Sequence, residues 1–302
     1  LSGLVDTVRS EGVDVVLVAG DVFDRAVPSV EAVGLYDDVT LTRAEEPSVT
    51  VAGPASLADP AGVPLDASNL ALRAVALLAQ RTGHHAALAV HISKGIPVAG
   101  GCAGGSADAA AALVGADALW GTGLGKDELA ALGAELGSDV PFSLHGGTAL
   151  GTGRGEHLTP VLEQGDYAWV LAISQGGLST PSVYAELDRQ RVTGPVGLVS
   201  DPSEVLAALR RGDAVALGRA LGNDLQPAAL ALMPPLRQVL NTGRDLGALG
   251  AVVSGSGPTI ALLARDDAHA VALASALNGQ GVCTTVRRAV GPVPGARVLE
   301  AT

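Results

Sequence analysis

One glycine-rich stretch, residues 96–113 with the sequence IPVAGGCAGGSADAAAAL, constrains the fold of this chain more than any other feature. Pro97 fixes the entry to the loop, and the alanines that follow the glycines are strong helix formers, with Ser106 and Asp108 as the expected caps. A loop that ends on a helix N-terminus gathers unpaired N–H groups and the positive end of the helix dipole, and glycines let the backbone approach a bulky anion. The stretch therefore predicts a phosphate-binding loop, and the flexible linker that glycine alone would suggest is the weaker interpretation.

The spacing of these glycines excludes two common nucleotide-binding loops. The P-loop requires GxxxxGK[ST], but the Gly-Lys pair at residues 125–126 is followed by Asp127 and has Trp120 in place of the first glycine. No strand-linked GxGxxG is followed about 20 positions on by an acidic residue, as a Rossmann site requires. The HRD and DFG motifs of protein kinases are also absent.

The composition limits the class of partner. The formal net charge is −12, from 31 acidic and 19 basic residues, which argues against a nucleic-acid partner and favours a small ligand. Cys102 and Cys283 stand in no metal-binding or redox spacing, so we expect two small buried hydrophobes in a reducing compartment. Because the sequence has no run of eighteen apolar residues and no signal-peptide pattern, we expect a cytoplasmic protein without a membrane segment.

Strand and helix patterns occur in mixed order along both halves of the chain. Short apolar or β-branched runs predict strands at residues 13–20, 48–53, 87–92, 168–174, 250–255, 259–264 and 283–289. Helical patterns cover residues 66–83, 126–137 and 266–277, with several more between 181 and 246. In the first of these helices Asp66 or Asn69 is the expected N-cap and Gly83 the stop. This order predicts an α+β fold in both halves, with a domain boundary shortly after the glycine-rich residues 146–156.

Three motifs in the right order resemble the GHMP family of small-molecule kinases: the glycine-rich stretch, LGSDVPF at residues 136–142 and VVSGSGPT at residues 252–259. The resemblance runs from about Tyr36 to the C-terminus. It implies a two-domain GHMP kinase fold, with a ribosomal protein S5 domain 2-like domain at 37–158 and a ferredoxin-like domain at 159–302, after an atypical segment at 1–36. It also implies ATP and Mg²⁺ as cofactors and a small-molecule alcohol as phosphate acceptor. Within the family, the motifs are most similar to those of the members that act on cytidine diphosphate methylerythritol.

The resemblance assigns roles to the residues that match the family's motifs. Asp139 would orient or accept the proton of the substrate hydroxyl, although from the sequence alone it is a helix N-cap before Pro141. The Ser106 hydroxyl would approach Mg²⁺, and Lys94, otherwise a solvated lysine, would approach the nucleotide. Tyr184 would stack on the cytosine base, or be an ordinary residue of an amphipathic helix. The other implied residues are Pro97, Val98, Ala99, Gly100, Gly101, Cys102, Ala103, Gly104, Gly105 and Ala107 at the nucleotide, and Thr180, Gly255, Ser256 and Gly257 at the substrate, where the SGSGP motif is otherwise a tight hairpin.

The first 36 residues depart from the family's pattern. The family's P-x-K-x-N motif should precede YDDVTL and supply a catalytic lysine, but the first lysine of this chain is Lys94. Residues 11–37, EGVDVVLVAGDVFDRAVPSVEAVGLYD, instead resemble a fragment of the metallophosphoesterase nuclease subunit of the SbcCD complex, in which Asp21 would bridge two metals. The companion D-x-H and G-N-H-[DE] motifs are absent, so we interpret this segment as a foreign N-terminus without nuclease activity.

Several functions are compatible with these observations. The first is an ATP-dependent kinase for the 2-hydroxyl of the cytidyl substrate, with activity lowered by loss of the lysine motif. The alternatives are a kinase for another alcohol such as homoserine or a mevalonate derivative, and a nucleotide-binding homologue without turnover. A metal-dependent phosphoesterase using Asp21 and Asp24 is the third and weakest. In each case we expect a monomer or weak homodimer.

Overall fold

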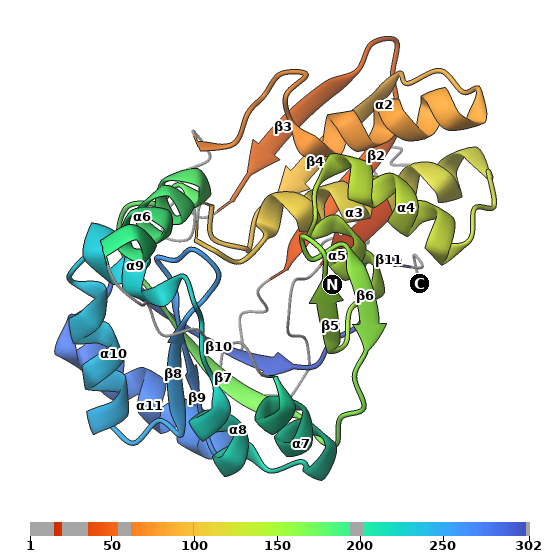
Figure 1. Ribbon diagram of the computed structural model, residues 1–302. Helices are drawn as coiled ribbons and strands as arrows, with labels where there is room; N and C mark the ends of the chain where they lie inside the picture. Colours follow the sequence, from red (N-terminus) through yellow and green to blue (C-terminus); the bar gives the residue numbers. More distant parts are fainter. Residues whose placement is uncertain (1–14, 20–35, 54–61, 99, 194–201, 300–302) are drawn as a thin grey trace.

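The computed structural model describes residues 15–19, 36–53, 62–98, 100–193 and 202–299. Within these residues the chain forms two halves, each with a β-sheet and helices packed against it (Figure 1). The mixed order of helices and strands confirms the predicted α+β class. None of the described helices is long and apolar enough to cross a membrane.

The sheet of the first half has the strand order β11-β1-β2-β4-β3. All neighbouring strands are antiparallel except β3 and β4, which are parallel. The strand predicted at residues 13–20 is β1, and it lies between β2 and β11. Strand β2 was not predicted, because the two aspartates at its start obscure the alternation that buries Val39 and Leu41. The bounds are β1 (Val15–Ala19), β2 (Asp37–Arg43), β3 (Ser48–Ala52), β4 (Leu88–Ser93) and β11 (Arg297–Val298).

Four helices belong to this half: α2 (Leu70–Thr82), α3 (Gly104–Trp120), α4 (Lys126–Leu136) and α5 (Val140–His145). Helix α2 begins as predicted, since the Asn69 side chain accepts hydrogen bonds from the N–H groups of Ala71 and Leu72. It ends as predicted at Gly83, which has a φ of 74°.

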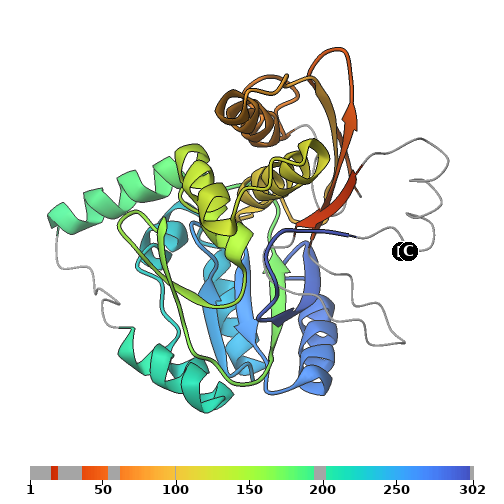
Figure 2. The ribbon, with the colours of Figure 1, turned by 90° about the vertical axis from the view of Figure 1, so that its right-hand side faces the viewer.

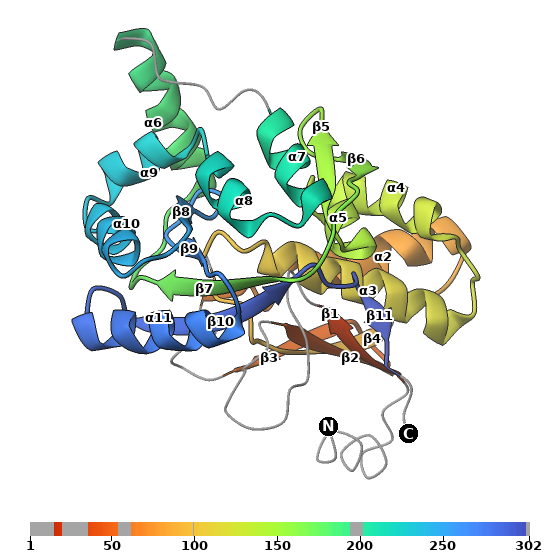
Figure 3. The ribbon, with the colours of Figure 1, turned by 90° about the horizontal axis from the view of Figure 1, so that it is seen from below.

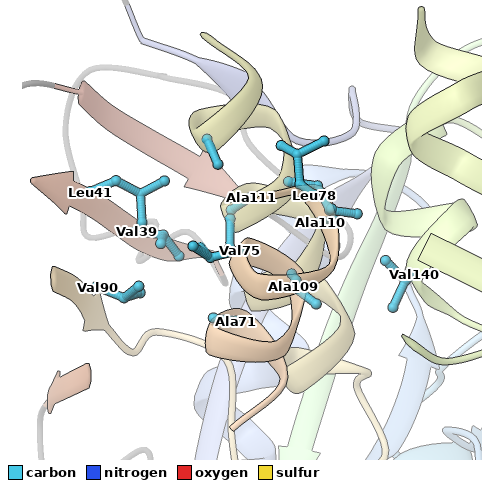
Figure 4. Packing of buried hydrophobic residues seen from close by; sticks show 14 of the residues in the cluster. Val39, Leu41, Ala71, Val75, Leu78, Val90, Ala109, Ala110, Ala111 and Val140 are labelled. Atoms are coloured by element: carbon cyan, nitrogen blue, oxygen red, sulfur yellow. The ribbon is translucent and has the colours of Figure 1, made fainter. Parts of the chain in front are cut away.

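The turned view shows how these helices stand beside the first sheet and above the second (Figure 2). Helix α3 is buried along most of its length because its alanines let it pack closely against both α2 and the sheet. The close view shows Val39 and Leu41 of β2 together with Val75 of α2 and the α3 alanines in one core (Figure 4). This packing fixes the N-terminus of α3, and with it the glycine-rich stretch.

The second half has the order of elements βαββαβ and a four-stranded antiparallel sheet, β10-β7-β9-β8. This strand order is the one expected for a ferredoxin-like domain. The strands are β7 (Tyr167–Ile173), β8 (Gly250–Val253), β9 (Ile260–Leu263) and β10 (Thr285–Gly291). The helices are α6 (Thr180–Thr193), α7 (Ser203–Arg211), α8 (Ala214–Ala220), α9 (Gln226–Leu232), α10 (Leu236–Asp245) and α11 (Asp267–Gln280).

The two faces of this second sheet have different neighbours. Alternate residues of β7, Ala168, Val170 and Ala172, pack in the core formed with α10 and α11. Tyr167 and Trp169 point the other way and pack with residues of α7 and α8, which lie on the opposite side of the sheet from α11 (Figure 3). The second sheet therefore directs one row of its side chains toward the first half of the molecule.

The connection between the halves is a hairpin of β5 (Ala149–Thr152) and β6 (His157–Pro160). The sequence predicted only a loosened glycine-rich segment here, and the glycines instead provide the positive φ angles of the hairpin turn at Gly153 and Gly155. The C-terminal segment returns to the first half, where the Gly147 N–H donates to the Val293 carbonyl (2.7 Å) and the Ala296 N–H to the Ser143 carbonyl (2.8 Å). The two halves are thus joined by two separate crossings of the chain.

Candidate active site

A cavity of about 580 Å³ lies between the two halves and brings most of the predicted site residues together. It is lined by the glycine loop, which we define as residues 96–105, and by the SGSGP loop at residues 254–258. The predicted residues that line it are Lys94, Pro97, Val98, Gly100, Gly101, Cys102, Ala103, Gly104, Gly105, Ser106, Asp139, Thr180, Tyr184, Gly255 and Ser256. Two others do not line it, because Ala107 is fully buried in the core of the first half and Gly257 is a buried residue of the SGSGP loop. Ala99, Asp21 and Asp24 lie outside the described residues.

The start of α3 differs from the prediction. The helix begins at Gly104, two residues before Ser106, and neither Ser106 nor Asp108 caps it. The N-cap residue is Ala103, which adopts a left-handed conformation with φ 50° and makes no side-chain cap bond; its carbonyl accepts from Ser106 N–H (2.9 Å) and Ala107 N–H (3.0 Å). The first N–H groups of a helix have no partner inside it, so Gly104 and Gly105 present such donors where they line the cavity.

The glycine loop and the SGSGP loop contact each other directly. The Ser254 hydroxyl donates to the Gly101 carbonyl (2.9 Å), and the Thr259 N–H donates to the Gly100 carbonyl (3.3 Å). A Cβ atom at Gly101 would stand 2.3 Å from the Ser254 carbonyl oxygen, and Gly101 has a φ of 75°. Only glycine fits this crossing, and the contact makes one continuous wall from motifs that lie far apart in the sequence.

Neutral hydrogen bonds hold the SGSGP loop in place. The Asn223 side-chain amide donates to the carbonyls of Val253 (2.8 Å) and Gly255 (2.7 Å). The hydroxyls of Thr180 and Ser256 share a hydrogen bond of 3.0 Å at the N-terminus of α6. Asn223 was not singled out from the sequence, where it stands in an unremarkable GND turn without a motif.

Asp139 occupies the N-cap position of α5, but its side chain does not perform the capping role. The carboxylate makes no cap hydrogen bond, lines the cavity, and accepts only a long bond from the Ser138 hydroxyl (3.4 Å) among the contacts that the structure records for it. Its backbone carbonyl instead accepts from the Ser143 hydroxyl (3.2 Å), which fixes the turn. The sequence allowed Asp139 to be either a helix cap or a ligand-facing carboxylate. In the structure Pro141 and the turn start the helix, and the Asp139 carboxylate remains available to a ligand.

Lys94 is buried between two carboxylates under the glycine loop. Its ammonium donates to Asp108 (3.0 Å) and to Asp37, whose second oxygen accepts from the N–H groups of Gly95 (2.7 Å) and Ile96 (2.9 Å). Burial alone lowers the pKa of Lys94, but the charges of Asp108 and Asp37 outweigh burial and raise that pKa. Burial, and then the charge of Asp37, raise the pKa of Asp108 well above its usual value, which Lys94 only partly opposes. We call these three residues the Lys94 triad; it anchors the entry of the loop and leaves the ammonium already paired.

Two further residues of the cavity bear on ligand binding. The Tyr184 side chain on α6 is 53% exposed, so its ring has a free face for stacking. Arg154 lies in the turn of the β5–β6 hairpin. Among the described residues that line the cavity, Arg154 and Lys94 carry the positive charge. Arg154 was missed from the sequence, where GTGRGE predicted only a flexible turn. Its contact with Glu156 is long, 3.6 Å, and its side chain is 78% exposed.

A metal ion would depend on the nucleotide as much as on the protein. Among the described residues, no group of three or more His, Cys, Asp or Glu side chains could hold a metal ion. The cavity offers the Ser106 hydroxyl and the Asp139 carboxylate. This donor set fits Mg²⁺, which commonly binds through one or two protein oxygens, substrate phosphates and water.

Comparisons with known proteins agree with this geometry. Residues 69–147 match the family described as GHMP kinases N terminal domain, and residues 205–283 match GHMP kinases C terminal. The 4-diphosphocytidyl-2-C-methyl-D-erythritol kinase of Nocardia farcinica is 54% identical over 270 residues, covering 89% of this chain and 87% of the relative. The enzyme of the same name from Streptomyces avermitilis is 56% identical over 272 residues, covering 89% of each chain. That of Mycolicibacterium smegmatis is 48% identical over 302 residues, covering 98% of this chain and 92% of the relative.

Solved structures give the same result for the fold. A crystal structure of 4-(cytidine 5'-diphospho)-2C-methyl-D-erythritol kinase has a TM-score of 0.65 and 27% identity, covering 91% of this chain and 96% of that one. A homoserine kinase from Cytophaga hutchinsonii has a TM-score of 0.70 with 19% identity, covering 94% and 96% of the two chains. The second likeness supports the shared fold alone.

Proposed function

This chain belongs to the GHMP kinase family of small-molecule kinases, and we propose that it transfers the γ-phosphate of ATP to the 2-hydroxyl of 4-diphosphocytidyl-2-C-methyl-D-erythritol in non-mevalonate isoprenoid precursor biosynthesis. The relatives that carry this name are about half identical to the chain over most of its length. The observation that carries the proposal is the joined wall of the glycine loop and the SGSGP loop, with Asp139 and Tyr184 in the same cavity.

Phosphoryl transfer requires the reacting groups to be positioned and the charge on the phosphates to be balanced. We assign the ATP phosphates to the first-turn N–H groups of α3 at Gly104 and Gly105, where the helix dipole favours an anion. Mg²⁺ would be held by the Ser106 hydroxyl together with the phosphates, and when bound it would spread their charge. Asp139, uncapped and open to the cavity, would accept or orient the proton of the attacking hydroxyl.

The cytidine end of the substrate fits the opposite side of the cavity. Tyr184 and Thr180 lie on α6 in the second half, across the cavity from the glycine loop. The exposed ring of Tyr184 would stack on the base, and the linked hydroxyls of Thr180 and Ser256 would hydrogen-bond to polar groups of the substrate. This arrangement would place the acceptor hydroxyl between the two ends of the cavity, near Asp139.

The charge that the family draws from its N-terminal lysine motif must have another source in this chain. Lys94 is already paired with two carboxylates, so its ammonium is a poor substitute. The Arg154 side chain is exposed in the cavity, and the contact recorded for it within the described part of the chain is a long one with Glu156, so we assign it to the phosphates of ATP or of the substrate. We further propose that the protein acts in the cytoplasm as a monomer or weak homodimer and has no nucleic-acid partner.

The direct test measures transfer of labelled γ-phosphate from ATP with Mg²⁺ to the cytidyl substrate. We expect turnover by the unchanged chain and a loss of about 10²–10⁴-fold in kcat for Asp139→Asn, with ATP affinity retained. Asp245→Asn, an exposed site at the end of α10 outside the cavity, is the matched control and should keep full activity.

A panel of acceptors separates the rival functions. Transfer to homoserine or mevalonate in preference to the cytidyl substrate would replace the proposal with another GHMP kinase activity. ATP binding without transfer to any acceptor would identify a nucleotide-binding homologue that lost turnover with the lysine motif. Either result would contradict the proposed reaction.

A further inference from the structure

A second cavity of about 390 Å³ adjoins the glycine loop, and neither Asp139 nor Tyr184 lines it. Its wall includes the row of β7 side chains that points away from α11, together with residues of α5, α7 and α8. The large side chains that line it are Phe142, Tyr167, Trp169, Leu171, Leu209 and Leu217. It shares only Pro97, Gly101 and Cys102 with the cavity of about 580 Å³ in which we place the nucleotide.

The chemistry of this wall is apolar and uncharged. None of its lining residues is Asp, Glu, Lys, Arg or His. Its hydroxyl groups already donate within the protein: Ser143 to the Asp139 carbonyl (3.2 Å), Ser254 to the Gly101 carbonyl (2.9 Å) and Tyr167 to the Leu209 carbonyl (3.4 Å), while Thr148 donates to the Glu163 carboxylate. A charged occupant would lose its hydration without finding a free hydroxyl or an opposite charge in return.

The size of the cavity distinguishes it from a packing defect. An apolar cavity of roughly 150 Å³ is already enough to remain dry and bind benzene. This one is larger, and it falls in the range of about 300–1,000 Å³ that is usual for ligand pockets. Aromatic side chains with a few bonded hydroxyls are the ordinary lining of such pockets.

We propose that this cavity is a second binding site, for an uncharged and largely apolar small molecule with two or three aromatic rings. Its occupant would lie against the Ser143 and Ser254 side chains, which bond the backbone of Asp139 and of Gly101. The nucleotide and the cytidyl substrate are excluded from this site by their charge, so it is distinct from the proposed reaction site.

The test uses N-phenyl-1-naphthylamine, an uncharged probe whose fluorescence rises in apolar surroundings. We expect saturable binding of one probe per chain that persists in saturating ATP, because the glycine loop separates the two cavities. Ala261→Phe adds a ring inside the cavity and should weaken probe binding at least ten-fold. Ala272→Phe is the same change on an exposed position of α11 and should leave probe binding unchanged.

Equal probe binding by both variants, or displacement of the probe by ATP, would overturn the proposal. Circular dichroism shows whether Ala261→Phe is folded. A second measurement leaves the cavity unfilled and uses two variants with one tryptophan each. Bromobenzene should quench the fluorescence of Trp169 in the Trp120→Phe variant, because that side chain lines the cavity. It should not quench Trp120 in the Trp169→Phe variant. Trp120 stacks on His84 at the far end of α3, outside the cavity. Equal quenching of the two tryptophans would also overturn the proposal.

Discussion

The glycine loop of the first half rests on buried charges, whereas the SGSGP loop of the second half rests on neutral amide hydrogen bonds. Beneath the glycine loop, one ammonium is held by the carboxylates of Asp37 and Asp108 with almost no exposure to solvent. Beneath the SGSGP loop, the amide of Asn223 donates to two backbone carbonyls. Removing one partner of a buried ion pair costs more than removing a neutral donor, because the charge that remains is unpaired. We call the Lys94 triad the charged anchor and Asn223 the neutral anchor. Although the two loops form one wall, we expect loss of the charged anchor to lower the free energy of unfolding more than loss of the neutral anchor.

The largest effect should come from the charged anchor. Lys94→Met keeps the length of the side chain but leaves Asp37 and Asp108 buried without their cation. We expect the free energy of unfolding to fall by about 3–5 kcal/mol at pH 7, measured by urea denaturation. Lys126→Met is the matched control, because the Lys126 ammonium is exposed and donates to the neutral carbonyl of His145, with no carboxylate partner among the described residues. A similar loss in both variants would show that the Lys94 triad is not a special anchor.

The next effect tests the crossing of the two loops. Gly101→Ala places a Cβ 2.3 Å from the Ser254 carbonyl oxygen in a backbone with φ 75°, so both strain and overlap oppose it. We expect a loss of about 2–4 kcal/mol in the free energy of unfolding, with weaker ATP binding by calorimetry. Gly123→Ala has a similar φ of 68° but open space around the new Cβ, so it should show the strain alone, about 1–2 kcal/mol. Equal losses would mean that the loops do not need this contact.

Removing the neutral anchor, Asn223, should lower the free energy of unfolding by a smaller amount. Asn223→Ala removes the donor to the Val253 and Gly255 carbonyls, and we expect about 1–3 kcal/mol by urea denaturation. Because the SGSGP loop lines the substrate side of the cavity, KM for the acceptor should rise more than kcat falls. Asn278→Ala, at an exposed position near the end of α11, serves as the control. A loss as large as that of Lys94→Met would contradict the ranking of the two anchors.

The comparison also shows which parts of the site the sequence could predict. The glycine loop, the N-cap at Asn69 and the stop at Gly83 depend on residues that are close in the chain, and the latter two were confirmed. The predicted cap of α3 was wrong: the N-cap is Ala103, three residues before Ser106, and it takes a left-handed conformation that alanine rarely adopts. The Lys94 triad and the contact of Gly101 with Ser254 join residues far apart in the chain, and no local pattern reports them. Arg154 has no signal beyond a glycine-rich turn until the hairpin brings it to the cavity.

The smallest effect is a pH-dependent gain in the free energy of unfolding at Asp38, next to Asp37 of the Lys94 triad. Burial, and then the charge of the neighbouring Asp37, raise the pKa of Asp38 from 3.8 to about 6, and one of its oxygens is buried without a hydrogen-bond partner. The folded state therefore keeps a proton that the unfolded state releases between about pH 4 and 6, so stability falls as the pH rises through that range. Asp38→Asn removes the charge and keeps the shape of the side chain. Because the carboxyl is partly exposed, we expect a gain of only about 1 kcal/mol at pH 7.5 that disappears at pH 4, measured by thermal unfolding at both pH values. Asp245→Asn should show no such difference, and a gain for Asp38→Asn that is equal at pH 4 and pH 7.5 would show that charge is not its cause.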